Sequence, residues 1–269
     1  QKLWQLDANP NEQYERYLVP AMFAPWASDL VELAAPQPGE RVLDVACGTG
    51  VVARLMAPQV GVTGKVVGLD FSAERLSVAR SQTPTQGAEV EWREGDAMTL
   101  PFADAEFNLV CCHQGLQFFP DRLAAIREMF RVLIPGGRLL LSVWRSIEHH
   151  PDAVAMAAAL QRHVSAEAAS VRNEIFSLGD AETIEGLLDE AGFREIVIRP
   201  IIKTLSFPSA EAFTTRYISA VGPLARMVSE VDDITRTAIL EDMSVALQSY
   251  INSDGLAIPT ASHLVTAHA

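Results

Sequence analysis

The sequence predicts an α/β protein with a three-layer, Rossmann-like fold, in which helices cover both faces of a mainly parallel sheet. Two observations lead to this prediction. Strand-like and helix-like segments alternate with short connections between residues 40 and 145, which is the pattern of successive βαβ units. Most strand-like segments are apolar along their length, as expected of strands that are buried on both faces, whereas residues 88–96 alternate between apolar and polar side chains.

The first half of the chain contains the alternating elements. Apolar residues at helical spacing predict a helix over residues 11–34. Five strands are predicted after it, at 41–46, 64–70, 88–96, 107–114 and 138–144. Helices connect them: one begins with "GVVARLMAP", one follows a Ser72 cap, and one covers "DRLAAIREMFRVL" and ends at "PGG" (135–137).

The pattern changes after residue 145. Residues 151–169 are rich in alanine and predict a helix, and residues 180–193 predict another, which Asp180 caps and Gly192 closes. A long or bent strand is predicted at 194–208, followed by helices over 209–252 and a last strand at 262–269.

The composition narrows the range of functions. The chain has 269 residues and a formal net charge of −13, which disfavours a nucleic-acid partner because phosphates would be repelled. We find no apolar run long enough for a membrane span and no signal-peptide core at the polar start. The three cysteines and the spacing of the six histidines predict a reduced, cytoplasmic protein without a bound metal. The scattered arginines are interpreted as a solvated face.

The stretch "VLDVACGTG" (42–50) indicates a ligand site where the first strand ends. Gly48 and Gly50 allow the backbone to turn tightly and to approach a ligand. In an open parallel sheet, ligands bind outside the carboxyl ends of the strands. Asp70 ends the second strand, and a carboxylate there can accept hydrogen bonds from ribose hydroxyls. These residues therefore predict a nucleoside cofactor.

Two nucleoside cofactors compete for this site: a nicotinamide dinucleotide and S-adenosylmethionine. Asp44 favours the second, because its carboxylate would repel a pyrophosphate but attract a sulfonium and an ammonium; the same carboxylate can also hydrogen-bond to the loop. Asp96 follows the third strand and can accept from an adenine amino group, while the Ala97 N–H faces a ring nitrogen. The alternative for Asp96 is a turn or cap.

Five sequence blocks then appear in order: "VLDVACGTG", "GLD", "EGDAMTLPF", "FNLVCCHQGLQFFPD" and "RVLIPGGRLLLSVW". With these blocks the chain resembles the class I S-adenosylmethionine-dependent methyltransferases. More narrowly, it is similar to their small-molecule branch, which includes enzymes of ubiquinone, menaquinone and natural-product biosynthesis. The resemblance covers residues 40–145 and, through "LLDEAGF", residues 180–200.

The resemblance implies which residues contact S-adenosylmethionine and its product S-adenosylhomocysteine. The methionine part is bordered by the first strand and its turn: Asp44, Ala46, Gly48, Thr49 and Gly50. The remaining contacts lie at the next strand ends: Asp70 at the ribose hydroxyls, Phe71 near the adenine, Asp96 and Ala97 at the adenine edge, and Cys112–Gln114, with His113, at the floor near the methyl group.

The resemblance also implies the architecture. It predicts one domain, 1–269, with a cofactor-binding core at 40–145 and a seven-stranded sheet whose last strand, at 262–269, is antiparallel. Helices in 1–35, 145–178 and 209–258 would form a cap over the substrate. The apolar stretch "AVAMAAAL" (153–160) could line the pocket, cover the core or form a homodimer contact, and these three roles stay open.

The predicted activity is in-line transfer of a methyl group to an O, N or C atom of a small, partly apolar metabolite. Because the sulfonium methyl is already activated, most of the catalytic work is alignment and exclusion of water. The candidate catalytic residues are His113 and Gln117.

Gln117 stands where several hydroxyl-methylating relatives have a histidine, and glutamine cannot take up a proton near pH 7. Three options follow: a base among His149, His150 and His163, a nucleophile that needs little help, or a carbon nucleophile. The alternatives to a methyltransferase are a non-catalytic S-adenosylmethionine-binding or scaffold protein and, less favoured, a nicotinamide-dependent oxidoreductase.

Overall fold

The computed structural model describes residues 4, 6, 8–82 and 86–269. The chain divides into two compact units, each with a hydrophobic core of its own. The unit that we call the sheet unit consists of Ala24–Trp144, Leu178–Ile201 and Ser262–Ala269. The unit that we call the helical unit consists of Gln1–Phe23, Arg145–Ser177 and Ile202–Ala261. Of the amino-terminal residues assigned to the predicted cap, 1–3, 5 and 7 lie outside the described residues.

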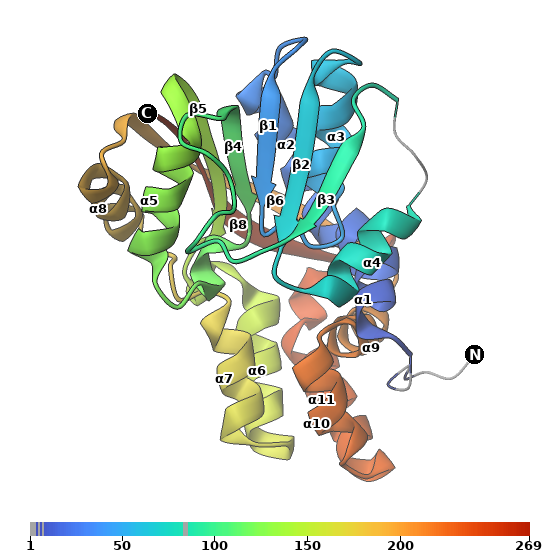
Figure 1. The fold of residues 1–269 in the computed structure, drawn as a ribbon. Coiled ribbons are helices and arrows are strands. Elements are labelled where there is room, and N and C mark those ends of the chain that lie inside the picture. Colours follow the sequence, from blue (N-terminus) through green and yellow to red (C-terminus); the bar gives the residue numbers. More distant parts are fainter. Residues whose placement is uncertain (1–3, 5, 7, 83–85) are drawn as a thin grey trace. The chain divides into compact units, whose positions relative to one another are not determined.

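The strands form one sheet in the order β3-β2-β1-β4-β5-β8-β6, with the short β7 paired to β8 (Figure 1). Their bounds are β1 Arg41–Val45, β2 Lys65–Asp70, β3 Val90–Glu94, β4 Phe107–His113, β5 Leu133–Trp144, β6 Arg194–Phe207, β7 Ile251–Asn252 and β8 Gly255–His268. β1 pairs in parallel with β2 and β4, and β5 pairs in parallel with β4. β8 runs antiparallel to β5, so the predicted sheet with its antiparallel last strand is confirmed.

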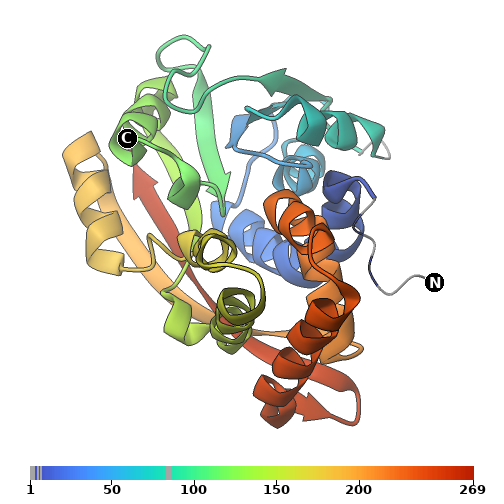
Figure 2. The ribbon, with the colours of Figure 1, turned by 90° about the horizontal axis from the view of Figure 1, so that it is seen from below.

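Helices cover both faces of the sheet unit (Figures 1 and 2). One face carries α2 (Ala24–Ala34), α3 (Val51–Val60) and α4 (Ala73–Ser81), and the other carries α5 (Arg122–Val132) and α8 (Ala181–Ala191). The predicted caps are present: the Ser72 hydroxyl accepts the Arg75 N–H at 3.2 Å, and Asp180 accepts that of Thr183 at 2.9 Å. Gly192 closes α8 with φ +101°, a left-handed conformation that favours glycine.

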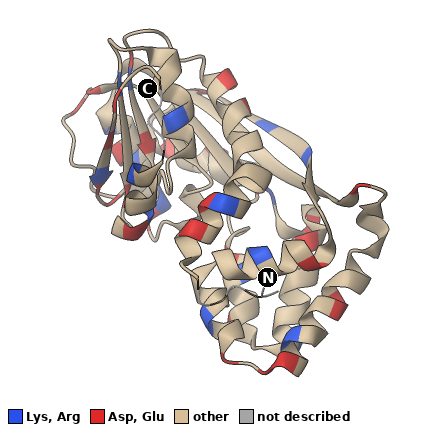
Figure 3. Cartoon of the chain, turned by 90° about the vertical axis from the view of Figure 1, so that its right-hand side faces the viewer, with Lys and Arg blue, Asp and Glu red and all other residues tan. Residues whose placement is uncertain are grey.

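The helical unit contains seven further helices within its described residues, around a core of its own that includes Phe213 and Tyr217. They are α1 (Pro10–Gln13), a π-helix (Tyr14–Phe23), α6 (Pro151–His163), α7 (Ala166–Glu174), α9 (Ala210–Ala220), α10 (Gly222–Ser229) and α11 (Asp233–Ala246). Short 3₁₀ turns add to these. Along the elements drawn in Figure 3, acidic and basic positions are interspersed rather than collected on one element.

Four boundaries differ from the predictions. The segment 151–169 is two helices, because the Ser165 hydroxyl accepts the Ala168 N–H and caps α7. The segment 11–34 includes the π-helical stretch, which holds Pro20; proline has no N–H for a regular helical bond. β5 begins at Leu133, ahead of "PGG", by pairing with Phe107. β8 begins at residue 255 rather than 262, because it pairs with β7, so the predicted helical region ends before 251.

The interior of the helical unit holds a buried ion pair. Arg172 on α7 donates to the Asp152 carboxylate on α6 at 2.7 Å and to the Tyr217 hydroxyl on α9 at 2.9 Å. Its guanidinium also lies over the rings of Phe176 and Tyr217. Only 2% of Arg172 is exposed, so the interpretation of the arginines as a solvated face is wrong for this residue. Burial raises the pKa of the Asp152 carboxyl, and the guanidinium opposes that rise.

Candidate active site

The chain turns sharply where β1 ends. Ala46, Gly48 and Gly50 have φ values of 56°, 57° and 90°, all in the left-handed region. Glycine adopts this region without strain. A β-carbon at position 50 would lie 2.2 Å from the Trp92 ring on β3, so a side chain there would collide with the indole. The glycine spacing seen in the sequence therefore corresponds to a turn that requires glycine at residue 50.

Asp70 joins this turn to the end of β2. Its Oδ2 accepts the Gly48 N–H at 2.7 Å, and its Oδ1 accepts the Ser72 N–H at 2.9 Å. The side chain is buried, with 2% of the residue exposed. An ionised carboxylate has about four lone-pair positions, so each oxygen can still accept another donor. Asp70 thus fixes the glycine turn and retains the capacity to accept ribose hydroxyls.

Asp44 on β1 is buried and only partly hydrogen-bonded. Its Oδ2 accepts the Ala53 N–H at 3.0 Å, near the start of α3. Its Oδ1 receives no hydrogen bond from any residue that the structure describes. Burial raises the pKa of Asp44 to about 7, the Ala53 N–H opposes the rise, and the Asp70 carboxylate adds to it. A cation placed at Oδ1 would supply the missing partner and favour the charged carboxylate.

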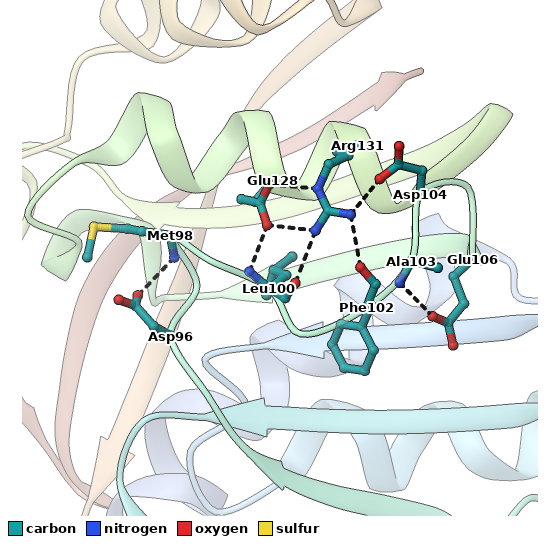
Figure 4. Close-up of polar contacts among 9 residues, drawn as sticks. All are labelled: Asp96, Met98, Leu100, Phe102, Ala103, Asp104, Glu106, Glu128 and Arg131. Atoms are coloured by element: carbon teal, nitrogen blue, oxygen red, sulfur yellow. Dashed lines mark hydrogen bonds and ion pairs between the residues drawn. The ribbon is translucent and has the colours of Figure 1, made fainter.

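The predicted adenine residues lie after β2 and β3. Phe71 is 80% exposed, which leaves its ring accessible to a planar ligand. Asp96 is exposed and accepts the Met98 N–H at 2.9 Å (Figure 4), so the turn role considered for it is present. Ala97 is buried. The joint role of Phe71 and Asp96 at an adenine stays a prediction.

The loop that carries Asp96 is held by an ion pair on α5 (Figure 4). Arg131 donates from Nε and Nη2 to the two oxygens of Glu128, both at 2.7 Å. It also donates to the carbonyl oxygens of Leu100 at 3.0 Å and Phe102 at 2.9 Å, and Glu128 accepts the Leu100 N–H at 2.7 Å. The ion pair lowers the pKa of Glu128. No sequence pattern indicates that Arg131 supports this loop.

Replacing Arg131 with methionine is expected to weaken S-adenosylhomocysteine binding about three- to tenfold, because its three bonds to this loop, to the Leu100 and Phe102 carbonyls and the Asp104 carboxylate, are lost, each worth about 1 kcal/mol. Calorimetric titration measures the affinity. Arg127→Met on the same helix is the matched control, because Arg127 forms an exposed ion pair with Glu190, at 3.1 Å, rather than a contact with this loop. Equal affinities in the two variants would show that the loop does not contribute to cofactor binding.

A buried polar network lies where β4 ends. Gln114 follows the strand with φ +53°, and its N–H donates to the Ser142 carbonyl at 2.9 Å. Its side-chain Nε2 donates to the Ser262 hydroxyl at 2.9 Å, and its backbone carbonyl oxygen accepts from Gln117 Nε2 at 3.0 Å. His113 Nδ1 lies 2.5 Å from the Ser142 hydroxyl oxygen. Both predicted catalytic residues, His113 and Gln117, therefore contact this network directly.

Two members of the network, Ser142 and Ser262, were missed by the sequence reasoning. Ser142 lies on β5 and Ser262 on β8, and both are fully buried. Each is a hydroxyl residue within a strand whose apolar neighbours also are buried. A polar side chain inside such a strand needs a hydrogen-bonding partner, and this is the signal that could have identified them.

The three other histidines considered as a base lie in the helical unit. His163 is bonded to Asp242 at 2.9 Å. His150 lies against the Phe176 ring, and burial, with the charge of Arg172 second, lowers its pKa to about 3. So low a pKa makes His150 a weak base. His149 belongs to a 3₁₀ turn, Ile147–His149.

The residues present fit the cofactor that the sequence implies. The buried Asp44 oxygen suits a cationic amino-acid group, and the left-handed glycine turn leaves backbone rather than side chains at the end of β1. Thr49, also in the turn, has a buried hydroxyl without a partner among the described residues. The exposed Phe71 ring suits a base. These features belong to the sheet unit alone.

Comparisons with known proteins agree with this fit. A family model described as a methyltransferase domain matches residues 43–141. The 2-phytyl-1,4-naphthoquinone methyltransferase of Thermosynechococcus vestitus is 36% identical over 189 residues, which are 65% of this chain and 80% of that protein. The chloroplastic 2-phytyl-1,4-beta-naphthoquinone methyltransferase of Arabidopsis thaliana is 45% identical over 118 residues, 42% of this chain; the match spans 45% of the Arabidopsis protein, about half its length.

A crystal structure of a Bacillus halodurans protein assigned as a methyltransferase is also similar. It superposes with a TM-score of 0.59 at 25% identity, over 90% of this chain and 97% of that chain. Within the described part of the chain, no helix combines the length and apolarity that crossing a membrane requires. The same described residues include no group of three or more side chains placed to hold a metal ion.

Proposed function

The chain belongs to the class I S-adenosylmethionine-dependent methyltransferases, and we propose that its acceptor is a reduced 1,4-naphthoquinone with an apolar side chain, methylated on a ring carbon. The observation that carries the proposal is the 36% identity with the Thermosynechococcus vestitus enzyme, whose name gives a phytyl-naphthoquinone as its substrate. The acceptor is thus a small, partly apolar molecule, and the choice among O, N and C falls on carbon.

When bound, S-adenosylmethionine supplies a methyl group on a cationic sulfur. The residues of the chain have to bind and orient the two reactants and exclude water, and good alignment alone lowers a barrier by roughly 7–11 kcal/mol. Asp44 offers its unpartnered oxygen to the cationic amino-acid portion. Asp70 fixes the glycine turn and would accept hydrogen bonds from the ribose. Phe71, Asp96 and Ala97 would hold the base.

A carbon acceptor agrees with the side chains at the end of β4. Gln117 cannot take up a proton at neutral pH, so a mechanism that depends on a base at this position is unsuitable. In a quinol, the hydroxyl raises the electron density at the neighbouring ring carbon. That carbon would form the new bond to the methyl group as the bond between the methyl group and sulfur breaks, with the electron pair of the broken bond staying on sulfur, and the carbon would then release its hydrogen as a proton. His113, tied to the Ser142 hydroxyl, is a titratable side chain at this strand end that can receive it.

The test is an anaerobic assay with isotope-labelled methyl donor and four acceptors: a 2-phytyl-1,4-naphthoquinol lacking the ring methyl, the corresponding oxidised quinone, a catechol and phosphoethanolamine. We expect mass addition of one methyl to a ring carbon of the quinol, located by fragmentation. Methylation of the catechol oxygen or of the amine, with the quinol untouched, would refute the proposed acceptor. No transfer to any acceptor, with intact binding of S-adenosylhomocysteine, would favour the non-catalytic alternative.

Four further expectations remain part of the proposal. The helices of residues 1–35, 145–178 and 209–258 are proposed to cover the substrate. A cytoplasmic location is proposed, although the Arabidopsis thaliana relative is chloroplastic. A homodimer and the lack of a nucleic-acid partner stay predictions, supported in the second case by the net charge of −13.

A further inference from the structure

We propose that Gln114 binds the methyl acceptor, through a hydrogen bond from a hydroxyl group of the acceptor to the side-chain carbonyl oxygen of Gln114. This inference rests on the proposed function, because it takes a quinol as the acceptor. It starts from the side-chain amide of Gln114, of which only the nitrogen has a hydrogen-bond partner among the described residues. Nε2 of Gln114 is bonded to Ser262, but Oε1 is buried and receives no hydrogen bond from the described residues.

The contacts of Ser262 settle which end of the amide faces which way. The Ser262 hydroxyl directs its hydrogen to the Val143 carbonyl oxygen at 2.8 Å, with the His263 carbonyl oxygen farther away at 3.4 Å. A hydroxyl has one hydrogen, so toward Gln114 the Ser262 oxygen can only accept. The atom of Gln114 that faces Ser262 must therefore be the amide nitrogen. Oε1 then points away from Ser262 as an acceptor without a donor.

Gln114 is also held in place from its backbone. Its N–H bonds to the Ser142 carbonyl, and its carbonyl oxygen accepts from Gln117. Its φ of +53° is unfavourable for a residue with a branched or long side chain and persists only where the surroundings fix it. Strained residues of this kind collect at ligand sites. Gln114 thus combines a strained backbone with an unpaired side-chain carbonyl oxygen. A hydrogen-bond donor on a bound ligand would account for the unpaired oxygen.

The strand order indicates which reactant supplies the donor. β1, β2 and β3, which carry Asp44 and Asp70 and lead into Asp96, lie on one side of β4. β5 and β8 lie on the other side, and the Gln114 amide reaches across to Ser262 on β8. Only the amide nitrogen is therefore directed away from the strands that carry the cofactor residues. The carboxylates on those strands, Asp70 and Asp44 with its unpartnered Oδ1, are the acceptors for the donors of S-adenosylmethionine. We therefore assign the donor at Gln114 Oε1 to the methyl acceptor.

A carbonyl oxygen on Gln114 also provides a means of specificity. It can accept a hydrogen bond from a quinol O–H, but an oxidised quinone offers only carbonyl acceptors at the same positions. An unpaired acceptor facing another acceptor is unfavourable, so the site would favour the reduced acceptor. The reduced form is also the one with a nucleophilic ring carbon.

The experiment compares two probes with and without a hydroxyl: 1,4-naphthalenediol, kept reduced, and 1,4-dimethoxynaphthalene. Each is titrated into the protein saturated with S-adenosylhomocysteine, and KM and kcat are measured for the demethyl naphthoquinol. The wild type is expected to bind the diol at least about tenfold more tightly than the ether, which corresponds to one hydrogen bond at a buried site. Gln114→Met is expected to lose that preference and to raise KM by a similar factor.

Three variants serve as controls. Gln114→Asn keeps an amide and tolerates the left-handed backbone, but its oxygen is one carbon shorter, so it should fold normally and still lose the diol preference. Ser262→Ala removes the bond that orients the amide but retains Oε1, so a smaller loss, about two- to threefold, is expected. Arg127→Met, on the exposed side of α5, should retain the full diol preference. In all variants the affinity for S-adenosylhomocysteine should stay within about twofold of the wild type.

The outcomes separate the two proposals. If the wild type methylates the quinol but folded Gln114→Met and Gln114→Asn keep the diol preference, the role of Gln114 is wrong and the proposed function stands. If S-adenosylhomocysteine affinity falls together with diol binding, Gln114 serves the cofactor or the fold, and the inference is also overturned. If the wild type neither binds nor methylates the quinol, the proposed acceptor fails and this inference with it.

Discussion

Replacing Asp70 with alanine is expected to reduce the affinity for S-adenosylhomocysteine by at least about tenfold and to destabilise the sheet unit. The substitution removes the acceptor of two backbone N–H groups, those of Gly48 at 2.7 Å and Ser72 at 2.9 Å. Each hydrogen bond to a charged group is worth roughly 1.5–3 kcal/mol, and 1.4 kcal/mol corresponds to a factor of ten in affinity. Calorimetric titration and thermal unfolding measure the two effects separately.

The ribose role of Asp70 needs a second readout, because a loosened turn would also weaken binding. The wild type should bind S-adenosylhomocysteine more tightly than its 2′-deoxy counterpart, and Asp70→Ala should bind the two alike. Asp121→Ala is the matched control: its carboxylate caps α5 through the Ala124 N–H at 2.9 Å, so it should cost about 1 kcal/mol of stability but no affinity. If Asp70→Ala still discriminates between the two nucleosides, Asp70 acts on the turn alone.

The sheet and its helix caps were predictable because their signals are local. Ser72, Asp180 and Gly192 stand at positions where helix ends require a side-chain acceptor or a left-handed residue, and the structure shows those roles. The turn at Gly48 and Gly50 was predictable for the same reason, since their positive φ values favour glycine. The antiparallel last strand came from the resemblance, and only its first residue was misplaced.

The polar contacts that complete the site were not predictable, because they join distant parts of the chain. Gln114 and Ser262 are 148 residues apart, and the antiparallel pairing of β8 with β5 brings them together. Arg131 supports a loop about thirty residues before it through hydrogen bonds to backbone carbonyls. Every residue has a backbone carbonyl, so no residue type in the loop indicates these bonds. An arginine on an exposed helix and one that fixes a loop look alike until the fold is known.

Arg172 is the clearest case of a polar contact that the sequence does not predict. Its replacement gives the largest expected loss of stability. Arg172→Met should destabilise the protein by about 3–5 kcal/mol, because it leaves the Asp152 carboxylate without its partner in an apolar interior. Arg172 is 2% exposed and Asp152 also 2%, so water cannot replace the lost contact. For a chain of this size the unfolding midpoint should fall by on the order of 10 °C.

The double variant Asp152→Leu/Arg172→Met separates the pair from its environment. With both charges removed, neither is left unpaired, and the stability should return to within about 1–2 kcal/mol of the wild type, although Tyr217 loses its partner. Arg162→Met on α6 is the control: Arg162 is bonded to Asp242 but its side chain is 65% exposed, so less than about 1 kcal/mol should be lost. Urea unfolding of the four proteins measures these differences. A double variant as unstable as Arg172→Met would show that the ion pair stabilises the helical unit, rather than merely compensating for its own burial.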